Sequence, residues 1–435
     1  MRATIVRGMS VSPRRLRNVR RIAWARPSAL PEDGRLGVTT VTVDGPRACR
    51  PHELGSVIDF ANLVFFHPHG SPPRIATLHP ELFTEANRAG VRLVRVDGHV
   101  AAAVTVFALP MRCVGPAGRS RLLAGCVGTV ATHPDYRRQG FGRAVLRDAL
   151  AHMREIGCDV GWLGTGIPAF YRALGWENAG SLDEFRLDRS HVDLLPTGEG
   201  LGLRCGPGGD ASVVTTLAAA EPVASERDSE LTRVRLDHVG REVWAAYRGR
   251  DAIAYVVFDS AADGDKALEH AGPADAVAAI IGAWLRARDD PERGWRPPAV
   301  PAAAAAQPPA AASTSSWGQG SANWTLQVSA PDAPGGLAQH LLDLGLPHRR
   351  GYQGMLRAIR PADLLRKLGC VGVAVEAEDD QSVTVRVAGA PGRLTHGRFA
   401  RWVFGPERVP GAPGLPCASE GAWPVRFHLS PLDHV

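Results

Sequence analysis

The chain has 435 residues, of which 45% are hydrophobic and 22% charged, so it has the composition of a globular protein and the length of two or three domains. No apolar run approaches the roughly 20 residues needed to cross a bilayer, which argues against a membrane span. The formal net charge of +6 is misleading, because residues 1–31 contain eight arginines and no acid, and 6 − 8 leaves −2 for the rest. Nucleic-acid binding by the folded part is therefore not expected.

Residues 1–35 are predicted to be a basic, disordered tail. They lack the apolar stretch of a secretory signal, although an Arg-rich, acid-poor segment is also typical of a transit peptide. An upstream choice of start codon would give the same composition, with Met9 as the alternative start. The seven cysteines are odd in number and include no Cys-x-x-Cys pair, which favours reduced thiols in a cytoplasmic protein.

Residues 36–194 are predicted to form the first domain. Asp97-Gly98 is a strong signal for a tight hairpin turn, and apolar residues recur at helical spacing before it. The loop with His67 and His69 has no neighbouring Cys or carboxylate pair, so a polar loop is preferred to a metal site and no metal is predicted. The first predicted elements are a strand at 37–43, a helix at 50–66 and hairpin strands at 91–96 and 100–107.

The segment 127–143, VGTVATHPDYRRQGFGR, joins an apolar strand to a glycine-rich basic turn that opens a helix. Backbone N–H groups and the positive dipole end meet at such a turn and suit a pyrophosphate, although a Gly-x-Gly turn alone is more typical of a solvated loop. A dinucleotide fingerprint is excluded because its third glycine would be Val145. The lack of Gly-Lys-Ser/Thr likewise excludes a P-loop.

Arg137-x-x-Gly140-x-Gly142, which follows the strand end Val130–Thr132, resembles the acetyl-coenzyme A loop of the GNAT (Gcn5-related) N-acetyltransferases. Further on, AFYRALGW at 169–176 resembles the Phe-Tyr-x-x-x-Gly-Phe element of the same family. The two elements occur in the family's order, and the resemblance is good over residues 120–190. It implies a mixed α/β (α+β) fold and an acyl-coenzyme A-dependent N-acyltransferase.

The resemblance also implies the site. Tyr171 would be the general acid that protonates the departing thiolate, the alternative being a core tyrosine packed beside Phe170 and Trp176. The strand end would pair with the pantetheine and polarise the thioester carbonyl, while amides of the loop hold the pyrophosphate. The implied cofactor-binding residues are Val130, Ala131, Thr132, Arg138, Gln139, Gly140, Phe141, Gly142, Arg143, Gly166 and Ile167.

Residues 195–358 are predicted to repeat the first domain in degenerate form. The segments 93–107 and 244–258 align without gaps, so that Gly98 meets Gly249 and Phe107 meets Phe258. The second copy has no Arg-x-x-Gly-x-Gly loop, which predicts a structural role without coenzyme A. Within it, the low-complexity Pro/Ala-rich stretch 297–320 is an insertion or an interdomain linker.

Residues 359–435 are predicted to form a small α+β domain. An active GNAT domain, a degenerate one and such a third domain resemble the plan of the Eis-type acetyltransferases, whose third domain is similar to a sterol carrier protein. That resemblance implies a homo-oligomer, a hexamer, and a chain terminus that reaches the active site. The carboxylate of Val435 would then be the base, and the side chains of Asp433 and His434 are alternatives.

Two functions of different kinds follow. The first is transfer of an acetyl group from acetyl-coenzyme A to a primary amine by direct attack in a ternary complex. The second is an acetyl-coenzyme A-sensing or lipid-binding module without turnover. A purely structural scaffold is disfavoured because the loop and Tyr171 occur together. Small-molecule or peptide amines, such as polyamines, aminoglycoside-like polycations or lysine side chains, are the implied acceptors.

Overall fold

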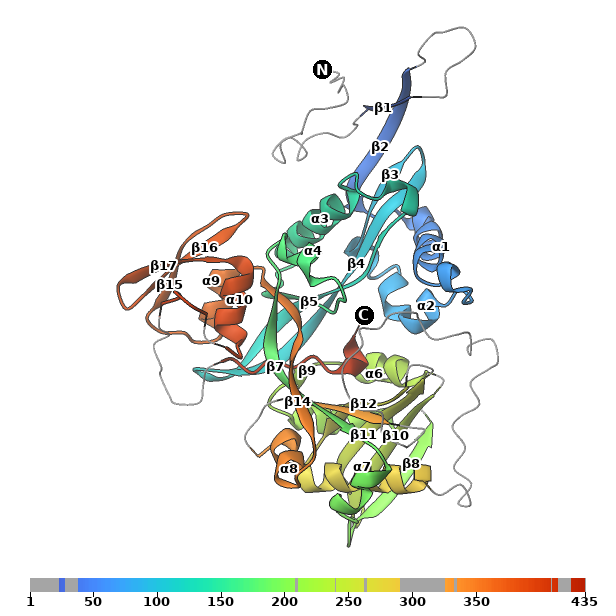
Figure 1. Cartoon of the computed structure of the whole chain (residues 1–435), viewed down its shortest axis with the longest axis vertical. Helices are drawn as coiled ribbons and strands as arrows, with labels where there is room; N and C mark the ends of the chain where they lie inside the picture. Colours follow the sequence, from blue (N-terminus) through green and yellow to red (C-terminus); the bar gives the residue numbers. More distant parts are fainter. Residues whose placement is uncertain are drawn as a thin grey trace. The chain divides into compact units, whose positions relative to one another are not determined.

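The computed structural model describes residues 23–27, 38–207, 210–238, 240–261, 264–289, 325–331, 335–407, 409–413 and 424–434 (Figure 1). Most of the predicted tail 1–35, all of the insertion 297–320 and Val435 lie outside these residues. The chain forms two compact units. The first contains the described residues up to Phe107 and Val127–His152, and the second contains Ala108–Cys126 and the described residues from Met153 onward.

The first unit is built on antiparallel strands with short helices beside them. The Asp-Gly turn is confirmed: Asp97 and Gly98 take φ values of 48° and 81°, and β3 pairs with β4 from Val91↔Thr105 to Val96↔His99. The helix α1 buries Val57, Phe60 and Ala61, which lie three and four residues apart. Three of its elements, β4, β5 and α3, continue into residues assigned to the second unit. The elements are β1 (Ala23–Pro27), β2 (Val38–Ala48), α1 (Leu54–Phe65), α2 (Ile75–Leu78), β3 (Val91–Val96), β4 (His99–Gly115), β5 (Gly118–Thr132) and α3 (Phe141–Glu155).

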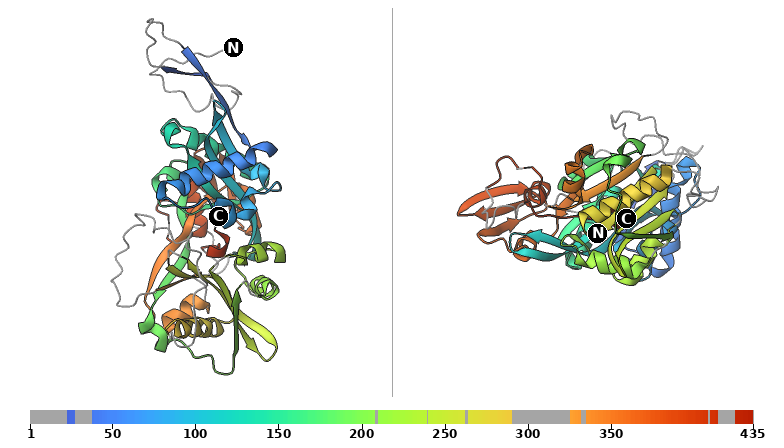
Figure 2. Two further views of the ribbon diagram at one scale, coloured as in Figure 1. Left: turned by 90° about the vertical axis from the view of Figure 1, so that its right-hand side faces the viewer. Right: turned by 90° about the horizontal axis from the view of Figure 1, so that it is seen from below.

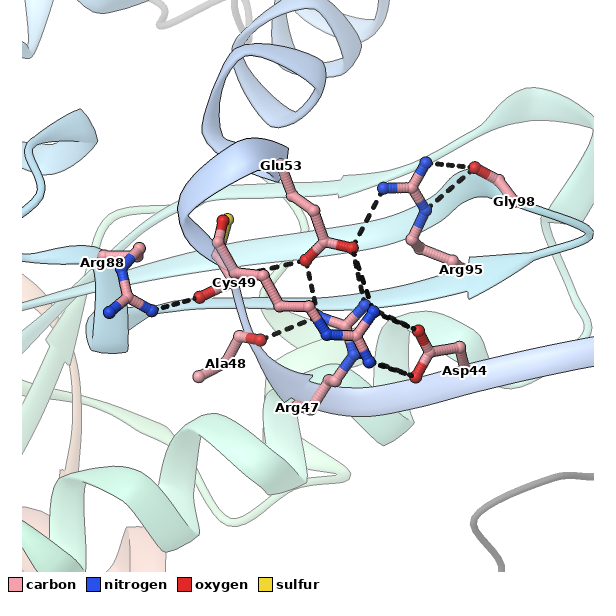
Figure 3. A network of polar contacts seen from close by, with 9 residues as sticks. Asp44, Arg47, Ala48, Cys49, Glu53, Arg88, Arg95 and Gly98 are labelled. Carbon is pink, nitrogen blue, oxygen red and sulfur yellow. Dashed lines mark hydrogen bonds and ion pairs between the residues drawn. The ribbon is translucent and has the colours of Figure 1, made fainter.

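A buried carboxylate joins β2, β3 and the start of α1 (Figure 3). The side chain of Glu53 is only 2% exposed and accepts hydrogen bonds from Arg47 Nη1 at 2.7 Å and Arg95 Nη1 at 3.1 Å. Arg47 also pairs with Asp44 at 2.7 Å. Burial opposes ionisation of Glu53, but hydrogen bonds from Arg47 and from the backbone of Arg50 outweigh it and lower the pKa of Glu53 to about 2.

The second unit contains the rest of the first repeat and the whole of the second. Apart from the two-residue β9 between α5 and α6, the order strand, two helices, three antiparallel strands, helix, strand, helix, strand is the same from β2 to β7 and from β8 to β14. The tandem GNAT-like plan predicted from sequence is therefore confirmed. The further elements are β6 (Val160–Leu163), α4 (Pro168–Arg172), β7 (Glu177–Leu187), β8 (Gly202–Pro207), α5 (Ala211–Ala220), β9 (Ala224–Ser225), α6 (Ser229–Leu236), β10 (Arg241–Arg248), β11 (Asp251–Ala261), β12 (Gly264–Ala271), α7 (Ala274–Asp289), β13 (Leu326–Pro331), α8 (Leu337–Asp343) and β14 (His348–Ala358).

The last strands of the two repeats are exchanged. β14 pairs antiparallel with β6, from Met355↔Leu163 to Ala358↔Val160, and along its other edge with β7. β7 in turn pairs with β13 of the second repeat. In repeats that each closed on themselves, β7 would lie beside β6 and β14 beside β13. Each repeat therefore completes its sheet with a strand of the other.

Alternate residues of β11 are buried on opposite faces of the second-repeat sheet. Ala254, Val256 and Phe258 pack with residues of α7 and α8, and Figure 2 shows α7 in yellow lying along that face. Tyr255 and Val257 pack on the other side with residues of α5, α6 and the C-terminal segment. Two layers of helices thus enclose the middle of β11, where residues 254–258 are all buried.

The third piece of the chain contains a three-stranded antiparallel sheet and two helices. Its helix α9 is tied to the second unit's sheet by Asp159, which is fully buried and pairs with Arg360 at 2.8 Å and Lys367 at 2.6 Å. α10 begins at His396, because Thr395 caps it and the preceding residues form β17. The elements are α9 (Pro361–Lys367), β15 (Val373–Glu378), β16 (Ser382–Val387), β17 (Ala390–Thr395) and α10 (His396–Phe404).

Within the described residues, no helix is long and apolar enough to cross a membrane. The six cysteines among them, all except Cys417, are free thiols.

The Glu53 network makes stability depend on pH. The folded-state pKa lies below the ordinary value of 4.5, so the stabilisation is complete above about 4.5 and is lost as the pH falls through about 2. Glu53→Gln is expected to lower the free energy of unfolding at pH 7 by up to about 3 kcal/mol, with a smaller deficit at pH 3. Denaturant unfolding of both proteins across this pH range measures the difference.

The control is Glu85→Gln, because Glu85 is 65% exposed and pairs with Arg88 on the surface. This change should cost less than about 0.5 kcal/mol. A deficit for Glu53→Gln that stayed constant from pH 7 to pH 3 would contradict the assignment.

Candidate active site

The glycine-rich loop of the first unit connects β5 to α3 and spans residues 133–140. Arg138 and Gly140 take left-handed backbone conformations, with φ values of 61° and 89°, and the first turn of the helix closes with Ala144 N–H donating to Gly140 O at 3.0 Å. The first N–H groups of an α-helix have no partner within the helix, so those after Gly140 are available to a ligand. The loop therefore presents amide donors at a positive helix end.

Positive side chains surround these donors. Arg137, Arg138 and Arg143 are all exposed, and within the described part of the chain none of them forms an ion pair. Gln139 is also exposed, and its Nε2 donates to Asp135 O at 3.0 Å. A phosphate group at this turn would meet cationic side chains whose charge is not already neutralised.

An aromatic stack supports the loop from within the first unit. The ring of His133 lies 6.4 Å from that of Phe60 and 5.6 Å from that of Tyr136, and Tyr136 meets Phe141 edge-on at 6.2 Å. His133 N–H donates to Ala101 O at 2.9 Å. The stack holds both ends of the loop, and the sequence analysis missed it. The aromatic residues at 133, 136 and 141 were its only sequence signal.

The strand end before the loop is irregular. Thr129 takes a φ of 50°, and its hydroxyl lies 3.3 Å from that of Thr105 on β4. After it, Ala131 is buried, whereas Val130 and Thr132 are partly exposed. The predicted cofactor-binding residues of the strand therefore alternate between the core and a more open side.

Tyr171 lies in the second unit, in the short helix α4. Its side chain is buried at 6% exposure and meets Phe170 edge-on at 5.1 Å. Burial raises the pKa of the Tyr171 phenol, although a hydrogen bond with Thr165 opposes the shift. The phenol is therefore protonated at neutral pH. Gly166 and Ile167, which precede the helix, are exposed, and Ile167 N–H donates to Thr165 Oγ1 at 3.0 Å.

The C-terminal segment belongs to the same unit. The ring of His434 lies 4.6 Å from that of Trp162 on β6, the strand that leads into α4. Asp433 is fully buried and its carboxylate is bound by Ser225 and Arg227, so it is not available as the base. Val435, the predicted base, lies outside the described residues.

The second repeat lacks the loop, as predicted. β12 and α7 are joined by Gly272 and Pro273 alone, whereas residues 133–140 join β5 and α3. Two residues leave no room for a turn around a phosphate. The described residues also contain no group of three His, Cys, Asp or Glu side chains that could hold a metal ion.

Comparison with known proteins shows which protein family the first domain matches. Residues 46–179 match the family model of the acetyltransferase (GNAT) domain. Similar solved structures include a GCN5-related N-acetyltransferase from Anabaena variabilis, 11% identical, with a TM-score of 0.54 over 84% of this chain and 90% of that chain. A probable N-acyltransferase from Enterococcus faecalis is 16% identical, with a TM-score of 0.52 over 76% of this chain and 75% of that chain.

Eis1 from Mycobacterium abscessus is 14% identical, with a TM-score of 0.48 over 82% of this chain and 85% of that chain. No curated protein matches the sequence. The matched family model includes the loop, α3 and Tyr171, so residues 46–179 are a GNAT acetyltransferase domain. Proteins of this class transfer an acyl group from acyl-coenzyme A to an amine, and the domain match supports an acyl-coenzyme A-dependent N-acyltransferase.

Gly140→Ala tests the loop. A Cβ at this position would meet nothing within 4 Å, so the cost is conformational, about 1–2 kcal/mol for a φ of 89°. The dissociation constant of coenzyme A is expected to rise about tenfold, measured by calorimetry.

The matched control is Gly98→Ala in the hairpin turn of the same unit. Gly98 also has a positive φ of 81° and open space around its Cα, so strain alone predicts a similar loss of thermal stability. Its coenzyme A affinity should stay that of the wild type. Equal affinities for all three proteins would show that the loop does not bind the cofactor.

Proposed function

We propose that the protein transfers an acetyl group from acetyl-coenzyme A to a primary amine by direct attack in a ternary complex. The observation that carries the proposal is the GNAT domain match over residues 46–179, which includes both the Arg-x-x-Gly-x-Gly loop at the start of α3 and Tyr171 in α4. A basic glycine-rich turn alone supports only anion binding. A protonated phenol in the family's second motif adds an acid suited to acyl transfer.

The loop and its strand would bind the cofactor. Amides from Arg138 to Arg143 hold the pyrophosphate, with the uncompensated guanidiniums beside them. Val130, Ala131 and Thr132 offer backbone groups to the pantetheine and polarise the thioester carbonyl. Gly166 and Ile167, at the start of α4, complete the cofactor-binding set. Acetyl-coenzyme A is a co-substrate here, and no metal is needed.

Tyr171 would act as the general acid. The neutral amine attacks the thioester carbon, the new C–N bond forms, and the C–S bond breaks as the sulfur leaves as a thiolate. The phenol donates its proton to that thiolate, and the proton lost by the attacking nitrogen passes to a base. Burial keeps the phenol protonated until the leaving group needs the proton.

The base in this proposal is the terminal carboxylate of Val435. The described residues next to it support the role, because His434 contacts Trp162 on β6, and β6 leads into the helix that carries Tyr171. The proposal further assigns the protein to the cytoplasm and to a homo-oligomer, and the third domain to a sterol-carrier-like fold.

Thiol release tests the transfer. Incubation with acetyl-coenzyme A and a panel of polyamines, aminoglycosides and lysine peptides is expected to release free coenzyme A with at least one acceptor. Tyr171→Phe should lower kcat about 100-fold or more and leave the cofactor dissociation constant unchanged, because only the proton donor is lost.

The control is Tyr247→Phe, since Tyr247 stacks on Arg204 in the second repeat. It should match the wild type. Tight cofactor binding without thiol release from any acceptor would favour a sensing module instead, and wild-type kcat in Tyr171→Phe would remove the acid from the mechanism.

Removal of Val435 tests the base. Deletion of this residue, or addition of one glycine after it, displaces the terminal carboxylate and should reduce kcat about 100-fold with cofactor affinity unchanged. A one-residue extension at the N-terminus is the control. If both C-terminal variants turned over like the wild type, the terminal carboxylate would not be the base.

A further inference from the structure

The C-terminal segment is built into the second repeat. Leu432 is 1% exposed and belongs to the core cluster that includes Val214, Leu236 and Tyr255. Ser430 Oγ donates to Leu268 O at 3.0 Å and accepts from Leu432 N–H at 3.1 Å. Figure 1 shows this red segment ending beside α6 of the second repeat.

A charged cluster lies at the centre of this contact. Arg227 is 2% exposed and forms ion pairs with two carboxylates, that of Asp433 at 2.8 Å and that of Glu269 on β12. Ser225 donates to the second oxygen of Asp433, and Tyr255 donates to Glu269 at 2.7 Å. One arginine of the second repeat thus bridges the chain's end and that repeat's sheet.

The electrostatics of the cluster favour its charged form. Burial opposes the charge of Arg227, but Asp433 and Glu269 outweigh it and hold the pKa of the guanidinium well above its usual value. Burial likewise opposes ionisation of Asp433, but Arg227 and Arg235 outweigh it and lower the pKa of that carboxylate. If Arg227 lost its charge, two buried carboxylates would lose the cation with which both form ion pairs. Arg227 is therefore the side chain that links the segment to β12.

The cluster also determines where the next residue lies. His434 follows Asp433 directly, its carbonyl accepts from Arg235 Nη1 at 3.5 Å, and its ring contacts Trp162. Trp162 itself is held by its indole N–H, which donates to Gln353 O of β14 at 2.9 Å. The second repeat thus fixes both sides of the contact between the C-terminal segment and β6.

We propose that Arg227 is a positioning residue for the reaction, which clamps the C-terminal segment through Asp433 and thereby holds His434 beside β6. The expected effect on turnover rests on the proposed acetyl transfer. The contact between Arg227 and Asp433 rests on the structure alone. It gives the second repeat, which lacks a cofactor loop, a specific part in the chemistry of the first.

Carboxypeptidase digestion tests the clamp without any reference to activity. Intact mass would follow the removal of residues past Asp433 from the full-length wild type and from Arg227→Met and Asp433→Asn. Asp433→Asn keeps the shape of the side chain, so it serves where Arg227→Met fails to fold. Release is expected to be about tenfold faster or more in both variants, because the anchor must open locally before the protease can act.

Steady-state kinetics tests the effect on the reaction. Both variants are expected to lose about tenfold or more in kcat, while the acetyl-coenzyme A dissociation constant stays within about twofold of the wild type. Arg227→Lys keeps the charge and should recover part of both losses. A change that only destabilised the fold would weaken cofactor binding as well.

The matched control is Arg288→Met, which removes another arginine–carboxylate pair of the second repeat, 2.8 Å from Asp265 and away from the C-terminal segment. It should digest and turn over like the wild type. Unchanged digestion in Arg227→Met and Asp433→Asn would overturn the clamp. Faster digestion with wild-type kcat would overturn its role in the reaction. If no acceptor were acetylated, the proposed acetyl transfer would be wrong. The digestion result would still show whether Arg227 holds the C-terminal segment.

Discussion

The exchange of the last strands between the two repeats is the constraint on which the second unit depends. The backbone groups along one edge of β6 are hydrogen-bonded by β14, a strand that the chain makes only after completing most of the second repeat. Unpaired backbone groups in a sheet interior are costly, and because β7 pairs with β14 and β13 instead, β6 needs the strand that the second repeat supplies. The strand that leads to Tyr171 therefore owes its position to a repeat without a cofactor loop.

The second repeat also holds the C-terminal segment in place. The chain leaves the second repeat, builds a small domain anchored through Asp159, and returns to bury Leu432 and Asp433 against the second repeat. A degenerate domain thus carries two structural tasks for an active one. It supplies a strand to β6 and a charged anchor for the end of the chain.

Much of the fold could be predicted from local patterns. Asp97-Gly98 and Gly249 marked two hairpins, because tight turns need residues that tolerate a positive φ, and both turns have one. The loop at 137–143 was predicted from its glycines and arginines, and the family model covers it. The aromatic stack at His133 and the buried Glu53 network were missed, because their members lie on separate elements and no spacing in the sequence joins them.

The sequence by itself determined the elements, the repeat and the chemistry of the loop, since turn propensity, hydrophobic period and motif spacing are properties of neighbouring residues. Only the tertiary structure decided which strand pairs with which. An apolar sequence predicts that a strand is buried, but it does not predict which strand lies beside it. It likewise decided the role of Asp433. In the sequence that residue is a carboxylate near a chain end, free to act as a base, and in the fold it is a buried partner of Arg227.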